Sequence, residues 1–193
     1  MKQKISDLGY GLGTYINADD IATEMHSRAL AGAAKAARKS FERPAFHEAG
    51  ARRQQSLEAG GTFSFETVFS HPSKIDFIKL AKAHGFRVKL LIVSTESAEI
   101  SIARVQKRVA EGGHDVPKDK IISRYARSMG LIVPASWHAD EAYLFDNSGP
   151  AMRAVASFVR GPTHKPNVRF APPLPAWVLA WARALTALVK AGG

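Results

Sequence analysis

RVKLLIVS, residues 87–94, is a short run rich in Leu, Val and Ile, and AYLFDN, at 142–147, has the same character. Runs of this kind are typical of parallel strands whose two faces are both covered. Strands are predicted at 87–94 and 142–146, and two more at 14–17 and 63–68. Helical periodicity fills the intervals between them. The alternation predicts an α/β fold with a parallel sheet flanked by helices.

The intervals between the predicted strands carry helix signals. Helices are expected at 19–41 with a break near Gly32, at 44–59, at about 71–85, from Thr95 to about Arg108, and from Pro117 to about Met129. Pro72 suits a first helical turn and Gly85 suits a helix end. Thr95 is expected to cap the next helix, whose acidic start and basic end complement the helix macrodipole.

The last part of the sequence changes in composition. It becomes Pro-rich in GPTHKPNVRFAPPLPAW, residues 161–177, and then has the pattern of one helix. We predict a single domain over residues 1–163. Over 164–193 we predict a Pro-rich segment and a C-terminal helix that docks on the same domain.

Composition and charge exclude several classes of protein. Apolar residues make up 46% of the 193 residues, so a core is expected and global disorder is not. The absence of cysteine excludes disulfides and thiolate chemistry and fits a cytoplasmic protein. No signal peptide is expected, and no apolar run reaches the roughly 20 residues of a membrane helix. The net charge of +10 predicts a phosphate-bearing substrate or partner, whereas nucleic acid is disfavoured because no motif supports it.

Polar residues lie at the carboxyl ends of three of the predicted strands. They are Asn17-Ala18-Asp19-Asp20, Glu66-Thr67 and Asp146-Asn147-Ser148. Ligands of parallel sheets bind at the carboxyl ends of strands, so a site is expected here. Two interpretations of Asp19 stay open, a helix cap or a general base that accepts a proton from a substrate hydroxyl. For Glu66 we favour function, because a carboxylate in an aromatic strand is costly unless it is paired or faces a cleft.

A second candidate constellation lies in SIARVQKRVAEGGHDVPKDKIISRYARS, residues 101–128. Arg104 and Arg108 share one helix face, away from an inward stripe of Ile102, Val105 and Val109. We interpret Gly112-Gly113 as a hinge between two Arg-bearing helices, the second of which carries Lys120, Arg124 and Arg127. Guanidinium groups bind phosphate oxygens with bidentate geometry, but a solvated basic face remains an alternative. No second histidine stands at metal-ligand spacing from His114, so no metal site is predicted.

Four stretches resemble the zeta-toxin family of P-loop kinases, including members labelled predicted ABC-type ATPases. They are YINADDIA, FSFETVFSHPSKIDFIKLAKAHGFRVKLLIV, ARVQKRVAEGGHDVPKDKIISRYARS and ADEAYLFDNS, and they cover about residues 13–150 in order. The resemblance implies transfer of the ATP γ-phosphoryl group to a hydroxyl of a UDP-N-acetylglucosamine-like sugar. It also implies ATP and Mg²⁺ as cofactors and an antitoxin-like protein as a partner.

The resemblance assigns roles to individual residues. Asp19 would match the catalytic base, and the substrate would be contacted at the strand ends by Asn17, Glu66 and Thr67. Arg104 would touch the phosphates, with Arg108 or Arg124 as the second arginine. The loop at Asp146–Ser148, with Asn147 at its centre, would lie near the adenine of the nucleotide.

One departure from the family pattern concerns the phosphate-binding loop. The pattern G-x-x-x-x-G-K-[ST] precedes the first strand in the family, together with a further strand, and it holds the phosphates and magnesium. Here no glycine is followed by lysine, and GYGLG at 9–13 is no substitute. We therefore expect a kinase domain without its first strand and P-loop, inactive as given. A misassigned start codon, a truncated gene or a natural remnant would each explain this. The alternative functions are a non-catalytic module that binds a phosphorylated ligand or a protein, and nucleic-acid binding through the basic surface.

Overall fold

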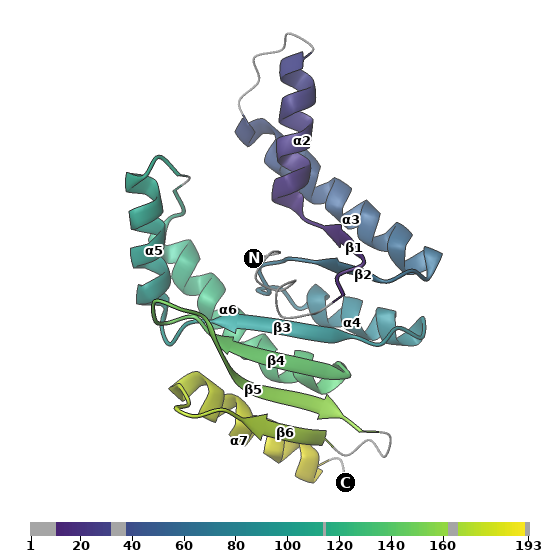
Figure 1. Cartoon of the computed structure of the whole chain (residues 1–193), viewed down its shortest axis with the longest axis vertical. Helices are drawn as coiled ribbons and strands as arrows, with labels where there is room; N and C mark the ends of the chain where they lie inside the picture. The colour runs from purple at the N-terminus through teal and green to yellow at the C-terminus, as the bar shows by residue number, and fades with distance from the viewer. Residues whose placement is uncertain (1–10, 32–37, 114, 162–165, 192–193) are drawn as a thin grey trace. The chain divides into compact units, whose positions relative to one another are not determined.

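The computed structural model describes residues 11–31, 38–113, 115–161 and 166–191 (Figure 1). The expected break near Gly32, His114 and the first part of GYGLG lie outside these residues. The chain divides into two compact units, Met1–Thr67 and Val68–Gly193, and each is described by itself.

Unit 1 is a two-stranded parallel sheet packed against helices. Strand β1 (Thr14–Ile16) pairs with β2 (Phe63–Phe65), so that Tyr15 lies opposite Ser64. Between the strands the chain forms α2 (Ala18–Ala31), the 3₁₀ helix η1 (Arg38–Phe41) and α3 (Glu42–Ala59). The core of this unit contains the buried residues Ile16, Ile21, Ala22, Ala45 and Ala49. The two alanines of α3 are four residues apart on one face, which lets the helix approach its neighbours closely.

Unit 2 contains a four-stranded mixed sheet in the order β3-β4-β5-β6. Strand β3 (Lys89–Ser94) is parallel to β4 (Glu141–Asp146), and the hairpin strands β5 (Arg153–Arg160) and β6 (Pro166–Phe170) are antiparallel to their neighbours. The helices are α4 (Ser73–Ala83), α5 (Ala98–Ala110), α6 (Lys118–His138) and α7 (Ala176–Ala191). The mixed sheet corrects the expected all-parallel arrangement, because β5 and β6 were not predicted.

The core of unit 2 joins the sheet to α6 and α7. Leu144 and Phe158 of the sheet are fully buried and cluster with Trp181 and Leu185 of α7. The indole Nε1–H of Trp181 donates to Ser136 Oγ of α6 at 3.1 Å, which satisfies both buried polar groups. The proposed division at residues 163/164 stays a prediction. Within the described residues, no helix is both long and apolar enough to span a bilayer.

Helix α6 continues nine residues past the expected end at Met129, with Pro134 inside it. A proline in a helix interior removes a hydrogen bond and costs about 3 kcal/mol. The residues around it are buried, with Ile132, Ala135 and Ser136 all 6% exposed or less. The burial of this apolar face offsets the cost, which is why the local signal to stop is overridden.

The expected cap at Thr95 is wrong. The N-cap of α5 is Ser97, and the buried Thr95 hydroxyl donates instead to the carbonyl of Ser97 at 2.8 Å. The expected inward stripe of α5 is also only partly correct, because Val109 is 37% exposed. The buried stripe does not include the last turn, because α5 ends at Ala110, one residue after Val109.

Gly112 and Gly113 form a structured helix end. Gly112 adopts φ +83°, its N–H donates to the Val109 carbonyl, and the Gly113 N–H donates to the Arg108 carbonyl at 2.8 Å. This pair of bonds is a Schellman motif. A Cβ on Gly113 would lie 2.5 Å from Arg108 Cγ, so both glycines are explained by the helix end. Motion at a hinge formed by Gly112 and Gly113 would therefore have to break the two hydrogen bonds of this cap.

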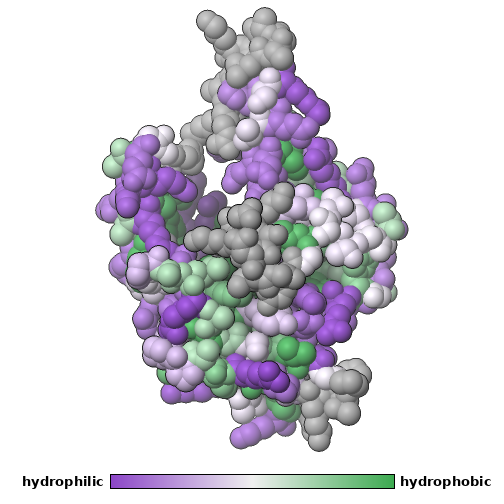
Figure 2. Space-filling view, in the orientation of Figure 1, coloured by the Kyte–Doolittle hydropathy of each residue, from purple (hydrophilic) through white to green (hydrophobic). Residues whose placement is uncertain are grey.

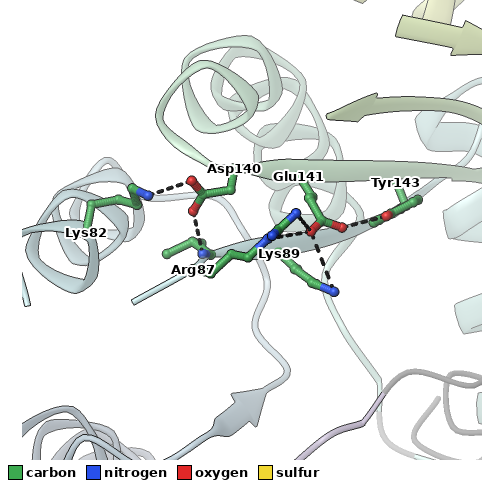
Figure 3. A network of polar contacts seen from close by, with 7 residues as sticks. Lys82, Arg87, Lys89, Asp140, Glu141 and Tyr143 are labelled. Carbon is green, nitrogen blue, oxygen red and sulfur yellow. Dashed lines mark hydrogen bonds and ion pairs between the residues drawn. The ribbon is translucent and has the colours of Figure 1, made fainter. Parts of the chain in front are cut away.

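A network of ion pairs ties the amino ends of β3 and β4 together (Figure 3). Lys82 Nζ lies 2.6 Å from Asp140 Oδ1, and Asp140 Oδ2 accepts the backbone N–H of Val88 at 2.7 Å. The buried Glu141 accepts from Arg87 at 2.7 Å and from the Tyr143 hydroxyl at 2.5 Å. These contacts satisfy the buried Glu141 carboxylate at the amino ends of β3 and β4, at the other end of this sheet from the loop at 146–148.

Candidate functional site

Three polar side chains meet at the carboxyl ends of β1 and β2 in unit 1. The Tyr15 hydroxyl donates to Glu66 Oε1 at 2.7 Å. The amide of Asn17 donates to the Tyr15 oxygen at 3.0 Å and reaches Glu66 Oε2 at 3.5 Å. The structure thus brings together two of the predicted residues, Asn17 and Glu66, through a third that was not predicted.

The protonation of this cluster follows from its surroundings. Burial, together with the neighbouring Glu66 carboxylate, raises the pKa of Tyr15 to about 12, against the opposing effect of the hydrogen bond from Asn17. Tyr15 is therefore a neutral donor at physiological pH. The cluster offers carboxylate oxygens as acceptors, which suits a ligand that carries hydroxyl groups.

Asp19 lies in the first turn of α2 with an exposed side chain. Its backbone N–H is bound by Asn17 Oδ1 at 2.7 Å, and the Asn17 carbonyl accepts the N–H of Ile21. Asn17 is therefore the residue that caps α2. In the part of the chain that the structure describes, the Asp19 carboxylate has no hydrogen-bond or ion-pair partner. Thr67 is likewise exposed, one residue after Glu66.

In unit 2, the loop after β4 is fastened to the end of β3. The backbone N–H of Asn147 donates to the Ser94 carbonyl at 2.8 Å. The Ser148 hydroxyl accepts the N–H of Glu96 at 2.8 Å and donates to Asp146 Oδ1 at 2.6 Å. The loop at 146–148, which was predicted to lie near a nucleotide base, is thus a turn held by hydrogen bonds of the Asp146 and Ser148 side chains and of the Asn147 backbone.

The Arg104 side chain is part of this fastening. Its guanidinium donates to the carbonyl of Asn147 and, at 3.2 Å, to that of Gly149. Arg104 and Asn147, both predicted, are therefore in contact. Arg108 is exposed at the last turn of α5, where its aliphatic stem lies beside Gly113, and Arg124 is exposed on α6. On the face drawn in Figure 2, α5 presents mainly hydrophilic side chains.

Two residues with evident roles were missed by the sequence interpretation. Tyr15 lies two positions before Asn17, so alternation along a strand places both on one face, and this signal was available. Ser148 was noted at the strand end but given no role, although it joins the ends of β3 and β4. A serine that bonds across 52 residues leaves no local signal.

The implied cofactors, ATP and Mg²⁺, need side chains that bind phosphates and a metal ion. Among the described residues, no group of three or more His, Asp or Glu side chains is placed to hold a metal ion. The sequence has no Gly-Lys pair to bind nucleotide phosphates. ATP and Mg²⁺ are therefore implied by the family alone.

Comparison with known proteins identifies a family to which the chain is similar. A sequence model of the zeta toxin family, described as "Zeta toxin", matches residues 16–133, well over half of the chain. An uncharacterized protein of Haemophilus influenzae is 38% identical over 63 residues, which are 33% of this chain and 45% of that protein. The match thus spans less than half of that relative. No solved structure matches the chain significantly. The family match extends from the last residue of β1 into α6 and includes Asn17, Asp19, Glu66 and Arg104, and on this basis the chain belongs to the zeta toxin family.

Proposed function

We propose that this chain carries the acceptor side of a zeta-toxin-like kinase and binds a nucleotide sugar of the UDP-N-acetylglucosamine type. The observation that supports this most is the pair of features at the end of β1. One is the hydrogen-bonded cluster of Tyr15, Asn17 and Glu66, and the other is the Asp19 carboxylate, which has no partner among the described residues. The family membership adds kinase-like chemistry to this geometry.

The chemistry assigned to Asp19 is proton acceptance from a sugar hydroxyl. An exposed carboxylate with no partner among the described residues is available to a ligand, and loss of a general base typically costs about 10²–10⁴-fold in rate. Glu66 and Thr67 are assigned to the sugar of the acceptor. In unit 2, Arg104, Arg108 and Arg124 are assigned to phosphates, which agrees with the net charge of +10.

A second candidate is a binding module that does not catalyse. It is favoured by one observation, the lack of any G-x-x-x-x-G-K-[ST] stretch in the 193 residues. Phosphoryl transfer depends on positioning and charge neutralisation at the phosphates, and this loop normally supplies much of both. Such a module holds a phosphorylated ligand or a protein partner without turnover. A cytoplasmic location and an antitoxin-like protein partner complete the proposal.

The proposal is tested by calorimetric titration of UDP-N-acetylglucosamine into the purified chain. We expect saturable binding that Glu66→Gln weakens by about tenfold or more, since hydrogen bonds to charged groups are worth about 1.5–3 kcal/mol. Glu48→Gln is the matched control, because Glu48 is a partly exposed glutamate of unit 1 that pairs with Arg52 on α3. The absence of binding, or equal effects of the two substitutions, would refute the proposal.

A further inference from the structure

The position of Tyr15 on β1 directs its side chain to the end of the sheet where Glu66 lies. Successive residues of a strand point to opposite faces. Ile16 is buried in the core of unit 1, so Tyr15 and Asn17 lie on the other face. Tyr15 is in register with Ser64, and Glu66 follows Ser64 by two positions on the same face. The parallel register therefore sets the phenol beside the carboxylate without any loop.

We propose that Tyr15 is a positioning residue, which holds the Glu66 carboxylate so that one oxygen is presented to the hydroxyl groups of a sugar ring. This inference rests on the proposed function and names the part of the acceptor that is recognised. Glu66 Oε1 accepts from the Tyr15 phenol at 2.7 Å, whereas within the described part of the chain Oε2 has only a 3.5 Å contact with Asn17. Oε2 is thus the acceptor with unused capacity, since a carboxylate oxygen accepts two hydrogen bonds.

The partners of Tyr15 keep the carboxylate in one orientation. The phenol accepts from Asn17 Nδ2 at 3.0 Å while it donates to Glu66. Asn17 is itself fixed, because its Oδ1 caps α2 through the N–H of Asp19. The start of the helix, the phenol and the carboxylate therefore form one chain of hydrogen bonds. The raised pKa of Tyr15 keeps the phenol a donor throughout the physiological range.

A similar pair elsewhere in the molecule shows what distinguishes Glu66. Tyr143 also donates to a glutamate, Glu141, but that carboxylate is buried and pairs with Arg87 and Lys89. Among the described residues, Glu66 forms no ion pair with a cation, and its side chain is only partly buried. The Tyr143 pair is satisfied within the protein, whereas the Tyr15 pair keeps an accessible negative charge that suits hydroxyl donors.

The test compares UDP-N-acetylglucosamine with UDP, which lacks the sugar, in calorimetric titrations of the whole chain. Tyr15→Phe is expected to weaken binding of the sugar nucleotide by about three- to tenfold, the worth of one hydrogen bond, and to leave UDP unchanged. In combination with Glu66→Gln it is expected to add nothing, because the phenol acts through that carboxylate. Tyr143→Phe removes a matching bond from the structural pair and is the control for effects on folding.

Three results would overturn the inference. The first is unchanged affinity for the sugar nucleotide in Tyr15→Phe. The second is an equal loss of affinity for UDP and for the sugar nucleotide in that variant. The third is additivity, in which the effects of Tyr15→Phe and Glu66→Gln on affinity sum in the double variant. A measurement without ligand separates this inference from the proposed function. The side-chain amide signals of Asn17 in NMR spectra are expected to move in Tyr15→Phe and in Glu66→Gln, but not in Tyr143→Phe. If they move and the parent chain binds no UDP-N-acetylglucosamine, Tyr15 still positions Glu66 and only the proposed function fails. If they stay fixed, the positioning role is refuted.

Discussion

Asn17 Oδ1 accepts the backbone N–H of Asp19 at 2.7 Å, so an amide side chain caps α2. The sequence left Asp19 with two interpretations, a cap or a functional carboxylate. In the structure the capping bond belongs to Asn17, and the Asp19 side chain is exposed in the first turn. The capping contribution of Asn17 to stability can therefore be measured apart from the role proposed for the Asp19 carboxylate.

The first prediction separates the cap from the carboxylate. Asn17→Ala is expected to lower the free energy of unfolding by about 1 kcal/mol or more, because it removes the cap. Asp19→Asn is expected to cost less than about 1 kcal/mol, the worth of a charge near a helix N-terminus, and Asp20→Asn is its matched control in the same turn. Urea unfolding followed by circular dichroism measures all three. A larger loss for Asp19→Asn than for Asn17→Ala would show that the cap is misassigned.

The second prediction concerns Arg104. Arg104→Ala is expected to weaken binding of a nucleoside triphosphate or a UDP-sugar by about tenfold, whereas Lys107→Ala on the same helix hardly changes it. The same substitution removes the bonds to the Asn147 and Gly149 carbonyls, so amide hydrogen exchange in the loop at 147–149 should accelerate. Equal effects of Arg104→Ala and Lys107→Ala on affinity would indicate a nonspecific basic face.

The third prediction is a dependence of stability on pH. Burial alone would raise the pKa values of Asp140 and Glu141, but hydrogen bonds and nearby cations lower both pKa values below the usual range. For Asp140 the lowering comes from Lys82 and the backbone N–H of Val88. For Glu141 it comes from Tyr143, Lys89 and Arg87. A carboxyl group whose pKa is lower in the folded state stabilises the fold above its unfolded pKa of about 4 and loses this contribution as the pH falls through the folded value.

The measurement is urea unfolding at pH 7, 5 and 3. Asp140→Asn and Glu141→Gln are expected to be less stable than the parent at pH 7 and to lose less stability on acidification. Glu58→Gln, at an exposed site on α3, provides the control for a change of net charge alone. Parallel pH profiles for the parent and the two network variants would contradict the assignment.

The fourth prediction contrasts two glycines. Gly112 has φ +83° in the Schellman cap of α5, so Gly112→Ala is expected to destabilise the protein by about 1–2 kcal/mol. Gly130 lies inside α6, where a Cβ would meet nothing within 4 Å, so Gly130→Ala is expected to stabilise it by about 0.4–1 kcal/mol. Denaturant midpoints of the two variants check both values. Stabilisation by Gly112→Ala would argue against the left-handed cap.

Strands and helices with strong local patterns were predictable. RVKLLIVS became β3 over Lys89–Ser94, and the Pro72 and Gly85 signals bound α4 as expected. The hairpin of β5 and β6 was not predictable, because RAVASFVR has no clear alternation and β6 begins at Pro166. A proline is tolerated at the first residue of a strand at the edge of a sheet, and pairing with β4 and β5 determines the rest.

The candidate site was predictable in its parts. Strand ends with polar residues pointed to Asn17, Glu66 and the loop at 146–148, and the structure pairs Asn17 with Glu66 through Tyr15. The contact of Arg104 with the Asn147 carbonyl could not be inferred, because 43 residues separate the two and a main-chain carbonyl carries no sequence signal. The roles assigned to these residues remain predictions.

We propose that these 193 residues bind the acceptor of a zeta-toxin-like kinase but lack the means to align nucleotide phosphates. The decisive assay is transfer of labelled γ-phosphate from Mg·ATP to UDP-N-acetylglucosamine by the purified chain, at a sugar-nucleotide concentration that saturates binding. We predict no transfer above the level of Asp19→Asn, because the arginines attract phosphates without the backbone cradle, lysine and metal ligand that position them. Robust turnover by the parent chain, abolished in Asp19→Asn, would contradict the claim and require a phosphate-binding element of a different kind.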